Sequence, residues 1–202
     1  MPTGHTSRAD ANRRRILDVA LAELLRDPDA SMDRIARAAG VVRRTVYGHF
    51  PSREALVGAL VDEAVRALTA AHAAGRARAE DPAEAVARSV LALWPSGDRY
   101  RLLVALARRA VTAQGVRERL APVRESAAEL LQQGLDQHVF SSPLPARALV
   151  RVHEQIVSAL LDAVADGLLA PAEAARAAAV TALTAAGVPA SLGGALVSRL
   201  DD

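Results

Sequence analysis

A single glycine between two short helical patterns restricts the fold of this chain more than any other feature. Over residues 31–39, apolar side chains recur every three or four positions, which is the spacing of one buried helix face. Gly40 follows at the place where a helix commonly ends in the left-handed conformation. A second short helical pattern runs from about residue 41 to 48. Two short helices joined by a tight glycine turn predict a helix-turn-helix, whose second helix enters the major groove of DNA.

Longer amphipathic helices are predicted on both sides of this unit. The first runs from about residue 11 to 26 and carries pairs of apolar residues four positions apart. The sequence Asp-Pro-Asp at 27–29 ends it, because the residue before a proline resists the helical conformation. Ser52 is a good N-cap for a helix that we expect to end near Gly75.

The second short helix presents groups that suit base recognition. Val46 and Phe50 share the inward face, which leaves Arg43, Arg44 and Tyr47 to project outward. An arginine can form a bidentate bond with guanine, and a threonine methyl such as that of Thr45 can contact a thymine methyl.

Other residues of this segment suit phosphate contacts, which fix the register of a protein on DNA. Ser31 lies at a helix N-terminus, and Tyr47, His49 and Arg53 are further candidate phosphate ligands. Other interpretations stay open for single residues. Tyr47 could be a core-edge aromatic, His49 a packed histidine and Arg53 a partner of nearby acids.

The stretch from Ser31 to Leu56 closely resembles the DNA-binding signature of the TetR (tetracycline-repressor) family. The Ile-Ala…Ala-Gly-Val turn, the Thr-x-Tyr-x-His-Phe run and the following Ser-Arg-Glu-Ala-Leu all stand at the family spacing. The resemblance covers residues 11 to about 60, and the rest is similar only in its succession of helices. It implies phosphate contacts from Tyr47, His49 and Arg53. The chain departs from the pattern at Val42, where many relatives carry a hydroxyl N-cap, so we expect a poorly capped first turn there. The candidate DNA-binding positions are Ser31, Val42, Arg43, Arg44, Thr45, Tyr47, His49 and Arg53.

The distribution of charge agrees with a nucleic-acid-binding head. Residues 1–53 carry 10 Arg against 6 acidic residues, a formal charge of +4, whereas the remainder carries −2. Solvated surface arginines, Arg43 and Arg44 among them, would give the same count, so charge alone does not decide.

Composition narrows the fold class further. Aromatic residues make up 2% of the chain and alanine is abundant, which favours an all-α protein. The chain has no cysteine, which excludes disulfides, zinc ribbons and thiolate catalysis. Neither a secretory signal nor an uninterrupted apolar stretch long enough for a membrane span is present, so we expect a cytoplasmic protein with no membrane contact.

Prolines and glycines punctuate the remainder into further helices. We therefore expect a helix-turn-helix DNA-binding domain over 1–53 and a helical ligand-binding and dimerisation domain over 54–202. The helices expected beyond Gly75 span about 82–93, 99–112, 116–120, 122–138, 145–166 and 171–186, with a final short one within 189–202.

The last two long helices are the expected dimer surface. A single helix-turn-helix contacts few bases, and two copies on half-sites of a palindromic operator gain specificity. Helices from two chains would form a four-helix bundle, although the same faces could instead complete a monomer core. The residues expected there are Leu149, Val152, Ile156, Leu160 and Val164 on one helix, and Ala174, Ala178, Val180 and Leu183 on the other.

A cavity for a small, mostly apolar effector is expected among the helices of residues 54–166. Core packing explains Trp94 and Tyr100 about as well as a ligand contact, and for His153 a structural role is favoured. The candidate lining residues are Trp94, Tyr100, Gln114, His138, Phe140 and His153, with Arg99 as a further polar possibility.

The sequence therefore predicts a homodimeric transcriptional repressor that a small-molecule ligand releases from its operator. A constitutive or partner-controlled regulator or activator without a ligand is the alternative. Catalysis is not expected, because the five histidines are scattered and no phosphate loop or nucleophile elbow is present. We likewise expect no cofactor and no metal site.

Overall fold

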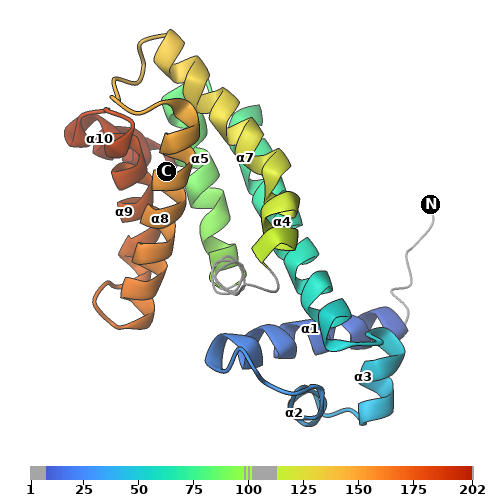
Figure 1. Cartoon of the computed structure of the whole chain (residues 1–202). Coiled ribbons are helices and arrows are strands. Elements are labelled where there is room, and N and C mark those ends of the chain that lie inside the picture. The colour runs from blue at the N-terminus through green and yellow to red at the C-terminus, as the bar shows by residue number, and fades with distance from the viewer. Residues whose placement is uncertain (1–7, 98, 100, 102–112, 202) are drawn as a thin grey trace, which may run out of the picture.

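The computed structural model describes residues 8–97, 99, 101 and 113–201, and every regular element within them is a helix (Figure 1). This confirms the predicted all-α class. The helices are α1 (Arg8–Arg26), α2 (Met32–Ala38), α3 (Arg43–His49), α4 (Arg53–Ala77), α5 (Pro82–Leu93), the 3₁₀ turn η1 (Trp94–Ser96), α7 (Ala113–Asp136), α8 (Ala146–Ala165), α9 (Pro171–Ala185) and α10 (Ala190–Asp201).

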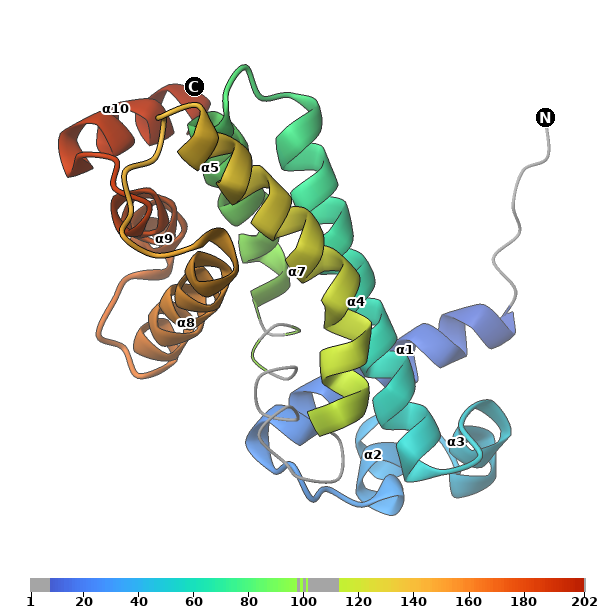
Figure 2. The ribbon, with the colours of Figure 1, turned by 45° about the horizontal axis from the view of Figure 1, so that its top comes forward.

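Helices α1–α3 form a small head at one end of the molecule, and α4 runs from this head into the helical body (Figure 1). Figure 2 shows α4 and α7 side by side, with α8 and α9 on the opposite side of the body. The predicted order, a helix-turn-helix followed by a helical domain, is therefore present.

The core of the head is closed beneath α3. Ile16 and Ile35, from α1 and α2, are fully buried, as is Val46 of α3. Phe50 is 2% exposed, so both residues predicted to point inward do so. Leu56 of α4 completes this cluster, which fixes α3 against the rest of the head.

An ion-pair network sets the angle between α1 and α2. The Glu23 carboxylate, mostly buried, accepts from Arg34 Nε at 2.5 Å, and Arg34 Nη1 donates to Asp27 at 3.1 Å. Gly40 has a φ of 63°, the left-handed turn that the sequence predicts before α3.

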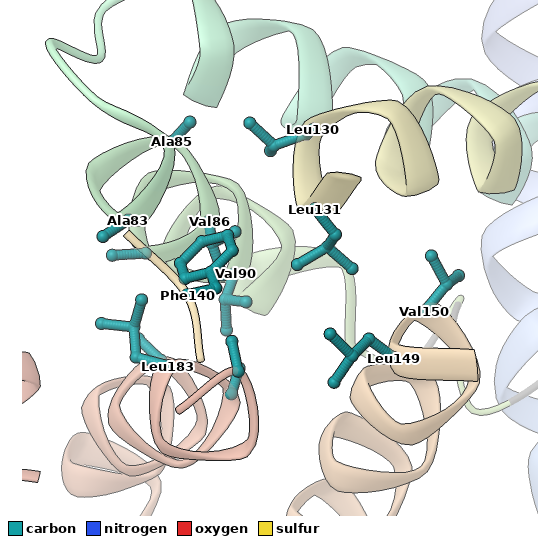
Figure 3. Packing of buried hydrophobic residues seen from close by; sticks show 14 of the residues in the cluster. Ala83, Ala85, Val86, Val90, Leu130, Leu131, Phe140, Leu149, Val150 and Leu183 are labelled. Carbon is teal, nitrogen blue, oxygen red and sulfur yellow. The ribbon is translucent and has the colours of Figure 1, made fainter. Parts of the chain in front are cut away.

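The body has a separate core built on alanine. Ala178, Ala179 and Ala182 of α9 are fully buried, and their short side chains let α9 lie close to α5. Figure 3 shows Phe140 with Val86 and Val90 of α5 and Leu183 of α9.

Burial corrects part of the predicted dimer surface. Leu149, Ala174, Ala178 and Leu183 are fully buried inside the protomer, so they are not available to a partner chain. The other predicted positions on these helices, Val152, Ile156, Leu160, Val164 and Val180, remain partly exposed.

Two helix predictions differ from the structure. The pieces expected over 116–120 and 122–138 are one helix, α7, with Pro122 inside it. Pro122 removes one backbone donor, and because this turn is exposed, water can satisfy the freed carbonyl. The expected tail helix is the twelve-residue α10. The helix predicted over 99–112 lies, apart from residues 99 and 101, outside the described residues.

Helix α4 ends close to Gly75, as the sequence predicts, and Gly75 itself allows α4 to cross α5 closely. A Cβ at this position would lie 2.2 Å from the Ser89 hydroxyl oxygen and 2.7 Å from the Ser89 backbone nitrogen. Only glycine permits this approach, and the helix continues for two more residues to Ala77.

No described helix is both long and apolar enough to cross a membrane.

Two alanine substitutions in α4 should have opposite effects. Gly75→Ala should lower the free energy of unfolding by about 2 kcal/mol, because a backbone atom of α5 cannot move aside cheaply. Gly58→Ala meets nothing within 4 Å and should raise it by about 0.5–1 kcal/mol through helix propensity. Denaturant unfolding of both variants measures this, and equal effects would mean that the α4–α5 crossing is not tight at Gly75.

Candidate DNA-binding interface and ligand cavity

Helix α3 presents an uncapped N-terminus to solvent. Val42 is its N-cap residue, with φ −75° and ψ 149°, and provides no side-chain hydrogen bond. The predicted lack of a side-chain cap on the first turn is confirmed. Val42 is also 69% exposed, so an apolar side chain stands at the tip of the helix that is expected to meet DNA.

The two arginines on the outward face of α3 differ in their contacts with the rest of the chain. Arg43 pairs with Asp33 of α2, with Nη1 2.9 Å from Oδ2. Its guanidinium also lies 5.1 Å from the centre of the Tyr47 ring and donates to the Tyr47 hydroxyl at 3.3 Å. Arg44 is exposed and forms no hydrogen bond or ion pair with the described part of the chain. Arg43 is therefore held in place, whereas Arg44 can reorient.

Thr45 and His49 are half-buried at the edges of this face. The Thr45 backbone nitrogen donates to the Val42 carbonyl at 2.9 Å, which closes the first turn of α3. The His49 ring lies 6.3 Å from the ring of Phe50. Arg13 of α1 lies over the same Phe50 ring, with its guanidinium 5.2 Å from the ring centroid.

Ser31 and Arg53 both have intramolecular partners. The Ser31 hydroxyl accepts from the Arg34 backbone nitrogen at 3.2 Å and caps α2. Arg53, half-buried at the start of α4, donates to the backbone carbonyls of Ala30 at 2.6 Å and of Pro28 at 2.5 Å. These bonds tie α4 to the loop between α1 and α2.

A second feature is an apolar cavity in the body, with a volume of about 140 Å³, between α4, α5, α7 and α8. Figure 3 shows part of its wall, with Val86 and Val90 from α5, Leu131 from α7 and Val150 from α8. Its polar lining groups are His72, Ser89, Arg124, His153 and Glu154.

Of the six predicted lining residues, His153 lines this cavity. Trp94 packs in the hydrophobic clusters of the body, and Phe140 is buried against α7, where a Cβ at Gly134 would lie 2.2 Å from its ring. His138 is exposed at the end of α7. Tyr100 and the side chain of Gln114 lie outside the described residues.

Arg99, the further polar candidate, does not line the cavity. Its Nη2 lies 3.6 Å from Asp18 Oδ1, so it pairs with α1 of the head.

Two histidines of the cavity wall are disfavoured in their charged form. Burial lowers the pKa of His153 below its usual value, although a hydrogen bond to the Ala182 carbonyl opposes this shift. Burial also lowers the pKa of His72, whose Nε2 lies 3.1 Å from the Ser126 hydroxyl oxygen. Both rings are therefore neutral at pH 7, and the wall adds no imidazolium charge.

The remaining charges of the wall, Arg124 and Glu154, pair with each other, and Glu154 also accepts from Arg151 at 2.8 Å. Arg124 Nε donates to Glu154 Oε1 at 2.6 Å and Nη2 donates to Oε2 at 3.2 Å, so α7 and α8 are joined by a bidentate contact.

Sequence reasoning missed His72, Arg124 and Glu154. A signal for His72 was available, because it follows Ala64 and Leu68 at four-residue intervals and so continues the apolar stripe of α4. The Arg124–Glu154 contact had no such signal, since the two residues are 30 positions apart.

Comparisons with known proteins agree with this geometry. Residues 16–60 match the model of the bacterial regulatory proteins of the tetR family. The chain is 33% identical over 128 residues to the HTH-type transcriptional regulator EthR of Mycobacterium tuberculosis, an alignment that covers 61% of this chain and 56% of EthR. It thus spans a little over half the length of the curated relatives it matches.

Solved structures match over more of the chain. The TetR-like regulator LfrR of Mycobacterium smegmatis, in complex with proflavine, aligns with a TM-score of 0.71 and 23% identity over 89% of this chain and 98% of LfrR. The fatty acid degradation regulator FadR of Bacillus halodurans aligns with a TM-score of 0.70 and 18% identity over 91% of this chain and 97% of FadR. Residues 16–60 are thus similar to the DNA-binding segment of the TetR family, and the chain as a whole has the fold of these TetR-like structures. These named relatives are described as regulators, in agreement with the DNA-binding regulator predicted from the sequence.

Arg53→Ala should destabilise the head, because two carbonyl groups lose a charged donor. We expect the free energy of unfolding to fall by about 2 kcal/mol, allowing for partial exposure of the guanidinium. Arg53→Lys, which keeps the charge but not the two-pronged donor, should recover less than half of this loss. Unchanged thermal stability combined with weaker binding to every DNA sequence would instead assign Arg53 to phosphate contact.

Proposed function

We propose that this protein is a homodimeric, DNA-binding transcriptional repressor that a small apolar ligand releases from its operator. The observation that carries the proposal is the exposed face of α3, with Arg43, Arg44 and Tyr47 on a head whose core is closed beneath them. A rigidly supported helix with arginines on its outer face suits the major groove.

Base and phosphate contacts divide among the α3 residues. Arg44 has no competing partner within the described chain and is assigned to a base edge. Arg43 can reach DNA only by giving up or sharing its contact with Asp33. Tyr47 and His49, half-buried at the rim, are assigned to phosphate groups together with Ser31. Thr45 and Val42 offer methyl groups to the groove.

Dimerisation would double the number of bases read and require a palindromic operator. The partly exposed apolar residues of α8 support this, because Val152 and Ile156 lie outside the described core clusters. Val164 of α8 and Val180 of α9 are also partly exposed, and Figure 2 shows α8 and α9 on the side of the body away from α4. Two copies of α8 and α9 would form a four-helix interface.

Helix α4 supports a role for a ligand. Its first half packs in the head through Leu56 and Leu60, and its second half lines the cavity through Leu68, Ala71 and His72. A molecule with different affinity for two positions of α4 would shift the head between them. LfrR, which has the same fold, is described in complex with proflavine.

Arg44→Ala should abolish specific operator binding while helicity and dimer mass stay unchanged. The operator is first obtained by selecting genomic fragments with the purified protein and footprinting them at physiological salt, where two protected half-sites are expected. Arg66→Ala removes an exposed arginine of α4 and is the matched control, with binding close to wild type. Wild-type affinity in Arg44→Ala would show that α3 does not read the bases as proposed.

Ile156→Arg should dissociate the dimer, because a desolvated charge would face its symmetry mate across the interface. Sedimentation equilibrium should give the monomer mass, and operator affinity should fall at least 100-fold through loss of the second half-site. Gln155→Arg, an exposed neighbour on the same helix, should remain dimeric. A stable dimer of the Ile156 variant would move the interface to another surface.

A further inference from the structure

One nitrogen in the cavity wall has no hydrogen-bond partner. His153 Nε2 is buried and unpaired within the described chain. The other polar wall groups are engaged: His72 with Ser126, the Ser89 hydroxyl with the Ala85 carbonyl, and Arg124 with Glu154. A buried polar atom without a partner is costly, and such atoms in native proteins commonly await a ligand or water.

The chemistry of a neutral imidazole limits which kind of partner this nitrogen can take. Burial lowers the pKa of His153, which favours the neutral ring, with a hydrogen on one nitrogen and a lone pair on the other. A hydroxyl group is a suitable partner for Nε2, because it can donate its hydrogen to the lone pair of this nitrogen.

A molecule about the size of benzene matches the volume of the cavity. Its volume is about 140 Å³, and a dry apolar cavity of about 150 Å³ accepts benzene. Valine, leucine and alanine side chains make up most of the lining, so the body of the ligand is apolar. Arg124 and Glu154 are already paired with each other, and Glu154 also with Arg151, so neither wall charge is left waiting for a charged ligand.

We propose that the cavity selects a small, uncharged apolar molecule carrying one hydroxyl group, which donates its hydrogen to Nε2 of His153. This deepens the function proposed above and rests on it for its biological meaning. The chemistry fits a phenol or a cyclic alcohol, and it disfavours the pure hydrocarbon of the same size, which would leave Nε2 unpaired.

The test compares two probes of nearly equal size, phenol and toluene, by calorimetric titration of the full chain. In His153→Leu the ratio of phenol affinity to toluene affinity should fall about tenfold relative to wild type, because the acceptor is replaced by an apolar group. His153→Gln, which keeps an acceptor oxygen, should retain most of the preference.

His72→Leu is the matched control. It changes a histidine of the same wall whose nitrogen already has Ser126 as partner, and Ser126 keeps its contact with Arg76. The affinity ratio should change less than twofold. Circular dichroism confirms that each variant is folded before titration.

The outcomes separate this inference from the proposed function. A ratio unchanged by His153→Leu, or no binding of either probe to wild type, overturns the inference. Release of operator DNA by phenol and toluene alike would support a ligand-responsive regulator while refuting the role of His153. Binding of phenol with the expected His153 dependence, but without any effect on DNA affinity, would support the inference and refute release by this ligand.

Discussion

The continuity of α4 is the constraint on which the rest of the molecule depends. One uninterrupted helix of 25 residues buries Leu56 and Leu60 in the core of the head and Ala71 in the body. The same helix therefore joins the two cores. Leu120 of α7 adds to this link, since it is buried with the head cluster and also lines the cavity. The head and the body predicted from the sequence are thus connected by buried residues of two helices.

Local patterns made the head predictable. The glycine turn at Gly40, the inward positions of Val46 and Phe50 and the missing cap at Val42 depend on residues within a few positions of one another, and each appears as expected. The partners of Arg43 and Arg53 were harder to predict from the sequence. Asp33 lies ten positions from Arg43, and the carbonyls that Arg53 contacts lie more than twenty positions away. A motif therefore predicts which arginines lie near DNA. It does not predict how many of their N–H groups already form hydrogen bonds within the protein.

The body was harder to predict because its contacts are long-range and its sequence is nearly uniform. An alanine-rich helix shows little contrast between its faces, so Ala174 and Ala178 could be assigned either to a dimer surface or to the core. Only the tertiary structure shows that they are fully buried. The cavity posed the same difficulty. The few aromatic residues were predicted to line it, yet the wall consists mainly of valine and leucine. The placement of these residues depends on how four helices cross.

The close crossing at Gly75 gives α4 the geometry of a lever. Contact with Ser89 fixes where α4 and α5 touch, and Arg53, at the start of α4, lies 22 residues away. At 1.5 Å per residue this arm is about 33 Å long. Under the proposed release, a tilt of α4 by about 5° around Gly75 would move its first turn by about 3 Å, close to the axial rise of one base pair. A small displacement near the crossing would thereby be enlarged to the scale on which DNA is read.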